Sequence, residues 1–255
     1  MRYCTAQIQR KDFPPAFTYE PATGMRTQMK RLTVLLSLMM MIAPFEFCLA
    51  QNDLAALKQK AAAGDPAAQV KVGMSYALAV PRDIREAMRW FRLAADQGYA
   101  DGQYRLGGMY DVAQSPQNPA EAIQWYTLAA KQGHKDAQYR LGVMYDQGRG
   151  TAKDYAQAAQ WYDKAGQQGR PEAQYRLGQM YEQGSGLTQS YPDAMKWYLM
   201  AARQGRAEAE YKVGYLYEKG LGTSQSRSDA IAWYQKSSAH GYPDATDAMK
   251  ALESQ

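Results

Sequence analysis

The sequence is poor in the residues that most often carry catalysis. Of its 255 residues, only two are cysteine and two are histidine. Cys4 and Cys48 both lie in the first 50 residues, which we expect to be removed, so the remaining chain would have neither a thiol nucleophile nor a disulfide. His134 and His240 lie far apart in the sequence, which argues against a shared metal site or a catalytic dyad. We therefore expect no enzyme, no bound metal and no cofactor.

A strong excess of one charge is also lacking. The whole chain carries 30 basic and 25 acidic residues, which gives a net charge of +5. Residues 1–50 hold six of the basic residues and three of the acidic ones, which leaves 24 against 22 in the rest of the chain. An excess of two positive charges is too small to indicate a nucleic-acid partner.

The first 50 residues contain the pattern of a secretory signal peptide. From Met29 the chain reads MKRLTVLLSLMMMIAPFEFCLAQ, a basic start followed by the apolar run Leu32–Ala43 and by Ala50 at a small-residue cleavage site. A membrane anchor is the alternative, but this run of twelve residues is shorter than the roughly 20 that span a bilayer. We expect translation to start at Met29, cleavage after Ala50 and no stable membrane insertion. The protein would then be periplasmic or secreted.

The sequence is rich in a repeating aromatic pattern. Its five tryptophans are spaced by 35, 36, 36 and 36 residues, at Trp90, Trp125, Trp161, Trp197 and Trp233. A glycine follows each tryptophan by eight residues, and a helix-capping residue precedes it by seven: Asp83, Asn118, Asp154, Ser190 or Ser226. An acid or amide three residues after the cap completes a capping-box signature. The glycine favours the left-handed turn that ends a helix, so each unit predicts a helix of about 15 residues, here called helix B.

A second pattern lies between successive B helices and is clearest in AQYRLGVMYDQGRG, at residues 137–150. Its apolar residues recur at i, i+4, i+7 and i+8, which predicts a partly buried helix A. A glycine recurs inside this helix: Gly73, Gly107, Gly142, Gly178 and Gly214. Glycine weakens a helix by about 1 kcal/mol relative to alanine. We therefore expect close packing at these glycines, against alanine pairs of helix B in the same repeat such as Ala94 and Ala95. We also expect one buried tryptophan per repeat.

These patterns, AQxxLGxxYxxGxG followed by DxxxAxxWYxxAAxQG, resemble the Sel-one-like repeat (SLR) family, a relative of the tetratricopeptide repeats. The resemblance implies an all-α fold, a right-handed superhelical α/α solenoid of about five helix-turn-helix repeats. It also implies that the inner, concave face binds peptides or protein domains. The first two repeats lack the GxG turn, and the mature chain expected after cleavage lacks the cysteines of several secreted members. The predicted repeats are 65–98, 99–133, 134–169, 170–205 and 206–241, between capping half-repeats at 51–64 and 242–255.

Two neighbouring positions of helix A predict a binding surface. The first holds a tyrosine in four repeats, with Val70 in the remaining one: Tyr104, Tyr139, Tyr175 and Tyr211. The second lies four residues later and differs in every repeat: Met74, Gly108, Val143, Gln179 and Tyr215. Packing keeps repeated positions alike, so a varying position is either a surface position with no binding role or one that contacts a non-repeating ligand. Tyrosine supplies rigid contact area of the kind found in binding hot spots.

A third position of helix A is basic in every repeat: Lys71, Arg105, Arg140, Arg176 and Lys212. These residues could line a positively charged groove, and we include Arg140 and Arg176 in the predicted contact surface. The simpler interpretation is an ion pair within the helix, worth about 0.3–0.5 kcal/mol. Its partner would be an acid four residues earlier: Asp101, Asp136, Glu172 or Glu208.

These observations predict an exported, non-enzymatic scaffold or adaptor that binds a protein or peptide partner on its concave face. Two alternatives remain open. One is a protein that binds or hydrolyses cell-wall material such as peptidoglycan or a β-lactam, although the chain shows no nucleophile motif for it. The other is a secreted factor that acts on host proteins, which the leader permits.

Overall fold

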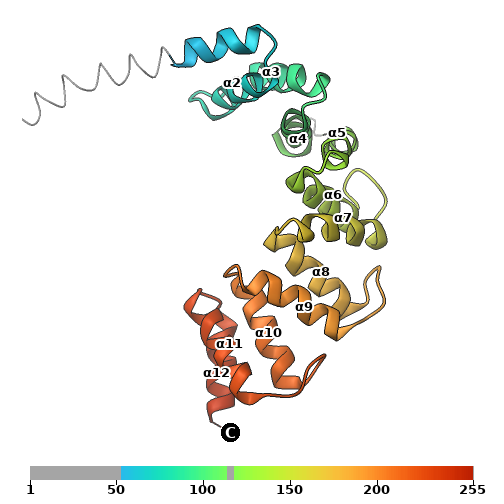
Figure 1. The fold of residues 1–255 in the computed structure, drawn as a ribbon, viewed down its shortest axis with the longest axis vertical. Helices are drawn as coiled ribbons and strands as arrows, with labels where there is room; N and C mark the ends of the chain where they lie inside the picture. The colour runs from blue at the N-terminus through green and yellow to red at the C-terminus, as the bar shows by residue number, and fades with distance from the viewer. Residues whose placement is uncertain (1–52, 114–117, 255) are drawn as a thin grey trace, which may run out of the picture. The chain divides into compact units, whose positions relative to one another are not determined.

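The structure, a computed structural model, describes residues 53–113 and 118–254. The predicted leader, with Met29 and the cleavage site after Ala50, lies outside these residues. Throughout the described residues the regular structure is helical and contains no strand (Figure 1). The prediction of an all-α fold is confirmed.

Two series of helices alternate along the chain. The A series consists of α2 (Pro66–Leu78), α4 (Ala100–Gly108), α6 (Lys135–Gln147), α8 (Pro171–Gln183) and α10 (Ala207–Lys219). The B series consists of α3 (Ile84–Asp96), α5 (Pro119–Lys131), α7 (Tyr155–Gln167), α9 (Tyr191–Ala202) and α11 (Arg227–Ala239). A helix over 53–62 precedes them, α12 (Pro243–Glu253) follows them, and a π-helical turn, Met109–Ala113, extends α4. Each helix from α2 onward packs against the next one in sequence, so the fold is an α solenoid of about five repeats.

The predicted caps of helix B are confirmed. The side chain of each cap accepts a hydrogen bond from the backbone N–H three residues later: Asp83, Asn118, Asp154, Ser190 and Ser226. A capping box also predicts that the cap's own backbone N–H donates to the acid or amide three residues later. This prediction is wrong. That N–H donates to a tyrosine carbonyl of the preceding helix A instead, as Asp154 does to Tyr145 at 2.9 Å. The cap residue therefore joins the start of helix B to the end of helix A as well as beginning the helix.

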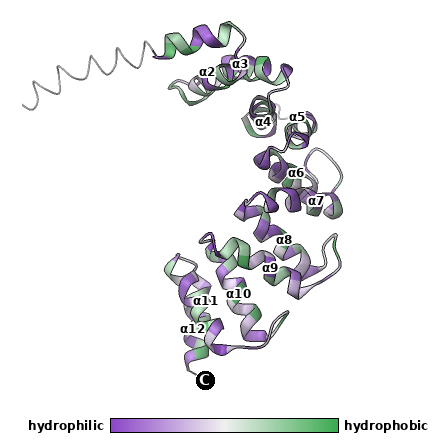
Figure 2. Cartoon of the chain, in the orientation of Figure 1, coloured by the Kyte–Doolittle hydropathy of each residue, from purple (hydrophilic) through white to green (hydrophobic). Residues whose placement is uncertain are grey.

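The predicted burial of one tryptophan per repeat is wrong in four of the five repeats. Only Trp197 is buried, and the other four tryptophans are half-buried. The aromatic residue directly after each tryptophan is the buried one, with an exposed fraction of 0–1%: Phe91, Tyr126, Tyr162, Tyr198 and Tyr234. Neighbouring residues of a helix point about 100° apart, so only one of the two rings can lie between helix A and helix B of its repeat, the pair here called the hairpin. The other lies at the seam with the preceding repeat, where Trp161 packs against the α5–α6 cluster. Figure 2 shows that hydrophilic and hydrophobic residues alternate on the same helices.

The buried ring explains the glycine inside helix A. A Cβ added to Gly142 would lie 2.5 Å from the Tyr162 ring, and the equivalent glycines approach the ring of their own repeat at 2.6–2.8 Å. The predicted pairing of these glycines with alanine pairs of the same repeat is wrong. The alanine pairs meet helix A of the next repeat, where a Cβ on Gly102 would lie 2.7 Å from Ala94 Cβ. Close helix approach therefore occurs both within repeats and between them.

Two glycines on the A helices should respond oppositely to the same substitution. We expect Gly142→Ala to lower the free energy of unfolding by about 1–3 kcal/mol, because the new methyl group overlaps the Tyr162 ring. Gly108→Ala should raise it by up to about 1 kcal/mol, because its Cβ would meet only the Tyr126 hydroxyl, at an ordinary 3.6 Å, and alanine favours the helix. Urea unfolding followed by circular dichroism measures both. A Gly142→Ala protein as stable as the wild type would contradict the close ring contact.

Candidate partner-binding surface

The predicted contact tyrosines lie at equivalent places on four consecutive A helices. Tyr104 is on α4, Tyr139 on α6, Tyr175 on α8 and Tyr211 on α10. Each ring is half-buried and tilts onto the buried tyrosine of its own hairpin, with ring centroids 5.3–5.8 Å apart. Tilted aromatic pairs of this kind contribute about 0.5–1.5 kcal/mol beyond their buried area. We call these four residues the tyrosine face, and its rings are held in place by the core beneath them.

A residue from the next repeat covers part of each ring. His134 stacks on Tyr104 at 4.6 Å between centroids, and the Tyr242 ring lies 5.1 Å from that of Tyr211. In the two middle repeats the cover is a guanidinium: Arg170 lies 4.5 Å from the centre of the Tyr139 ring, and Arg206 lies 4.8 Å from that of Tyr175. The sequence analysis missed these covering residues. Each directly follows the glycine that ends a B helix, so their position in the repeat was the available signal.

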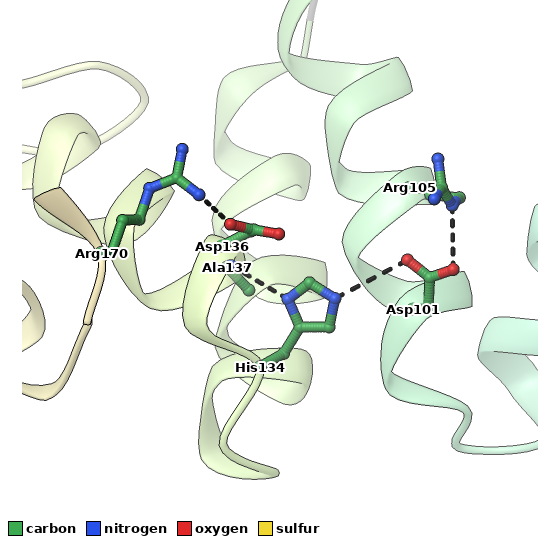
Figure 3. Close-up of polar contacts among 6 residues, drawn as sticks. All are labelled: Asp101, Arg105, His134, Asp136, Ala137 and Arg170. Carbon is green, nitrogen blue, oxygen red and sulfur yellow. Dashed lines mark hydrogen bonds and ion pairs between the residues drawn. The ribbon is translucent and has the colours of Figure 1, made fainter. Parts of the chain in front are cut away.

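Charged residues link the start of one A helix to the next (Figure 3). Asp101 on α4 pairs with Arg105 at 3.0 Å and lies 3.7 Å from Nε2 of His134. Nδ1 of His134 accepts a hydrogen bond from the backbone N–H of Ala137, so this histidine also caps α6. Burial alone would raise the pKa of Asp101, but hydrogen bonds from His134 and Arg105 more than offset it and hold that pKa below its usual value. Figure 3 shows the same arrangement one repeat later, where Arg170 reaches Asp136.

The predicted ion pairs within helix A form in only one of four repeats, between Asp101 and Arg105. Asp136 pairs with Arg170 of the next repeat, and Glu172 also pairs with Arg170, at 3.3 Å. Glu208 pairs with its neighbour Arg206 at 3.2 Å. These acids lie in the first turn of their helices and pair with the same arginines that cover the tyrosine rings. The simpler interpretation of the basic position is therefore wrong in three repeats.

The basic residues that make no ion pair within their own helix lie beside the tyrosine face: Arg140, Arg176 and Lys212. Arg140 is half-buried and lines one pocket with Tyr104 of the preceding repeat, and it makes no ion pair with any residue that the structure describes. Arg176 donates to the side-chain oxygen of Gln179 at 3.2 Å. Lys212 reaches back to Glu182 of the preceding repeat at 2.9 Å. Arginine at this position thus keeps donors available next to the tyrosine rings.

The varying position lies next to the same rings. Gln179 donates to the Tyr175 hydroxyl at 3.2 Å and, with Arg176, lines a polar pocket of about 130 Å³. Tyr215 lies between two lysines, with Lys212 Nζ 5.7 Å and Lys219 Nζ 6.0 Å from its ring centre. Val143 packs at the edge of the α7–α8 core cluster. Met74 and Gly108 line a larger, mostly apolar pocket together with Tyr104 and Arg140. The structure therefore brings the tyrosine, basic and varying positions together in successive local groups.

A family model described as Sel1 repeat matches residues 66–99, 100–134, 135–169, 171–205 and 207–242. The chain belongs to the Sel1 repeat family. Proteins of this family mediate protein–protein interaction. No curated protein matches the sequence.

Two solved structures resemble this Sel1 repeat protein. One is a protective antigen present in uropathogenic Escherichia coli strains that displays an SLR fold, with 38% identity and a TM-score of 0.75. The other is a Sel1 repeat protein from Oxalobacter formigenes, with 34% identity and a TM-score of 0.70. Each match covers 78% of this chain, but only 43% of the first protein and 59% of the second. The chain therefore corresponds to a part of each of these larger proteins.

A ladder of buried amide side chains joins the Sel1 repeats, and the sequence analysis did not find it. A glutamine in each of the first four A helices donates to a carbonyl eight residues earlier, at 2.8–3.3 Å: Gln69, Gln103, Gln138 and Gln174. Each accepts in turn from a second glutamine at the end of helix B, at 2.7–2.8 Å: Gln97, Gln132, Gln168 and Gln204. In the fifth repeat Glu210 and His240 take these places, 2.8 Å apart. The ladder satisfies buried polar groups at the start of the first four A helices.

The two histidines therefore have separate structural partners. His134 caps α6 and stacks on Tyr104, whereas His240 contacts Glu210. Within the described part of the chain, no group of three or more histidine, cysteine or acidic side chains is placed to hold a metal ion. None of the described helices is both long and apolar enough to cross a membrane.

Proposed function

We propose that this Sel1 repeat protein is an exported, non-enzymatic scaffold that binds a protein or peptide partner along the tyrosine face. We take this face to be the inner, concave surface of the solenoid. The observation that carries the proposal is the arrangement around Tyr139 and Tyr175. Each ring is anchored on a buried tyrosine, lies under an arginine of the next repeat, and keeps part of its surface in water. Rigid aromatic area next to charged donors is the composition of binding hot spots.

The leader supports export to the periplasm or the outside of the cell. The chain carries a basic start, a short apolar run and a small-residue cleavage site before the first repeat. The similar Escherichia coli structure is that of a protective antigen. We propose, from its leader, that this chain also lies outside the cytoplasm.

The test compares two double variants in a crosslinking experiment on intact cells. Tyr139→Ala with Tyr175→Ala removes both central rings, and we expect at least a tenfold loss of the protein crosslinked to the wild type, as measured by mass spectrometry. Leu93→Ala with Leu128→Ala is the control, because both side chains are exposed on B helices, α3 and α5, and neither lines a pocket beside the tyrosine face. This control should leave the crosslinks unchanged. Circular dichroism and urea unfolding of both purified variants check that they remain folded.

Equal crosslinking by the wild type and the Tyr139→Ala, Tyr175→Ala variant would exclude the tyrosine face as the contact. Crosslinks that disappear in the control variant but not in this one would place the partner on the B helices instead.

A further inference from the structure

An apolar pocket lies at the first two repeats. It has a volume of about 270 Å³ and opens between α2 and α4, with the buried Phe91 and Tyr126 rings among its lining residues. The exposed wall consists of Leu78 and Val112, with 71% and 63% of their surface in water. A cavity of about 150 Å³ with aliphatic walls is large enough to bind benzene. The pocket can therefore accept one large apolar side chain.

The pocket is apolar because the first two repeats differ from the other three at specific positions of helix A. At the last position of helix A, Leu78 and Val112 stand where the later repeats have polar residues: Gln147, Gln183 and Lys219. One position earlier, Ala77 stands where the later repeats have an acid that accepts the hydroxyl of the buried tyrosine, as Glu218 does from Tyr234 at 2.7 Å. In the first repeat the hydroxyl is missing as well, because Phe91 replaces tyrosine. Both partners of that polar contact are thus absent together.

Gly108 provides the space. It occupies the varying position, where the other repeats carry Met74, Val143, Gln179 or Tyr215. A Cβ built on Gly108 would meet only the Tyr126 hydroxyl, at 3.6 Å. Unlike the glycine beside it, whose Cβ would lie 2.8 Å from the Tyr126 ring, Gly108 is not required by helix packing. Its lack of a side chain leaves the pocket open without serving the fold.

One wall of the pocket carries a positive charge. Arg140 of the third repeat lines it, and this arginine makes no ion pair within residues 53–113 and 118–254. Arg105, the other basic lining residue, is paired with Asp101, and the nearby Asp111 is paired with Arg149. Burial tends to lower the pKa of Arg140, but the oxygens of Tyr126, Tyr104 and Asp111 raise it overall, so the guanidinium stays charged. A carboxylate of a partner would complete its coordination.

We propose that this pocket binds a linear segment of the partner protein in which a large apolar side chain, such as Leu, Met or Phe, lies close to an acidic residue. The apolar side chain fills the space above Gly108, and the carboxylate pairs with Arg140. This inference rests on the proposed function, since it names what one part of the tyrosine face recognises. It also accounts for the departure of repeats one and two from the repeat pattern at Ala77, Leu78 and Val112.

The experiment selects random 12-residue peptides displayed on phage against the purified full chain. Enriched peptides are then synthesised, and their affinities are measured by fluorescence polarisation. We expect an apolar residue within three positions of Asp or Glu in the enriched peptides. Gly108→Leu, which fills the pocket, should weaken their binding at least tenfold. Arg140→Gln should weaken it about tenfold and remove the preference for Asp over Asn at the acidic position.

Two controls match these substitutions away from the pocket. Ala120→Leu adds the same bulk at an exposed place on α5, and Arg89→Gln removes an exposed arginine of α3. Both should bind the selected peptides as the wild type does. Urea unfolding should show Gly108→Leu to be as stable as the wild type, because its Cβ has room.

Several outcomes would overturn the inference. Selection of no peptide, or of peptides without the apolar and acidic pair, excludes this specificity. Self-association that is lost in Gly108→Leu would show that a second copy of the chain fills the pocket. If selected peptides keep their affinity for Gly108→Leu but lose it for the Tyr139→Ala, Tyr175→Ala variant, the pocket is excluded while the proposed function stands. Peptides insensitive to all of these changes count against both.

Discussion

Tyr162→Ala should lower the free energy of unfolding by about 3–5 kcal/mol, more than the same change at the neighbouring Trp161. The Tyr162 side chain is fully buried, packs against Gly142 and donates to Asp146 at 3.2 Å, so its removal leaves a cavity and an acid without its donor. Trp161 is larger but only half-buried, at the seam with the preceding repeat. Urea unfolding of the two variants, followed by circular dichroism, gives the comparison.

A matched pair of conservative variants separates packing from hydrogen bonding. Tyr162→Phe keeps the ring and should cost much less than Tyr162→Ala, about 1–2 kcal/mol. The first repeat shows that this ring position functions with phenylalanine, since Phe91 packs against Gly73 in the same way. A larger loss of stability in Trp161→Ala than in Tyr162→Ala would contradict the assignment of the buried ring.

The protein should become sharply less stable above about pH 10. Burial raises the pKa values of four tyrosines well above the free value, and a nearby carboxylate raises each of them further: Tyr126, Tyr162, Tyr198 and Tyr234. Because these pKa values are raised in the folded state, the stability they contribute is complete below the unfolded pKa of about 10 and is lost as the pH rises toward the folded values. Four such groups can lower the free energy of unfolding by up to about 5 kcal/mol per pH unit.

Urea unfolding at intervals from pH 8 to pH 11 measures this slope, and tyrosinate absorbance follows ionisation directly. Tyr198→Phe is the control for deprotonation of lysines, which occurs over the same range in both proteins. It should remove up to about a quarter of the slope, because one of the four most strongly raised groups is gone. An unchanged slope in Tyr198→Phe, or stability that stays constant above pH 10, would show that the buried hydroxyls are not responsible.

The sequence predicts the helices well because their signals are local. Trp161 and its equivalents mark the period, and residues such as Asp154 begin each B helix by accepting a backbone N–H a few residues away. No local signal in the sequence shows which of the two neighbouring rings is buried. Both Trp161 and Tyr162 recur in every later repeat, and only the angle between the two helices decides which ring enters the hairpin.

The grouping of residues on the proposed contact surface could be predicted only in part. The tyrosine, basic and varying positions do lie together, but the residues that cover the tyrosines were missed because they differ in type: His134, Arg170, Arg206 and Tyr242. A cation and an aromatic ring can both stack on tyrosine, so one structural role is filled by several residue types. The apolar pocket was missed for another reason. Leu78 and Val112 lie at the ends of their helices, and only their comparison with Gln147 reveals the difference.

The glutamine ladder makes the joints between most repeats interchangeable. Gln138 and Gln168 form the same pair of bonds as Gln174 and Gln204, so a copy of the third repeat placed after itself would present matching hydrogen-bonding groups at both new joints. The last joint differs, because the carboxylate of Glu210 has no N–H to donate to the preceding helix and contacts His240 of its own repeat instead. Such an array can lengthen by duplication of an internal repeat, whereas a copy of the fifth repeat would not extend the ladder.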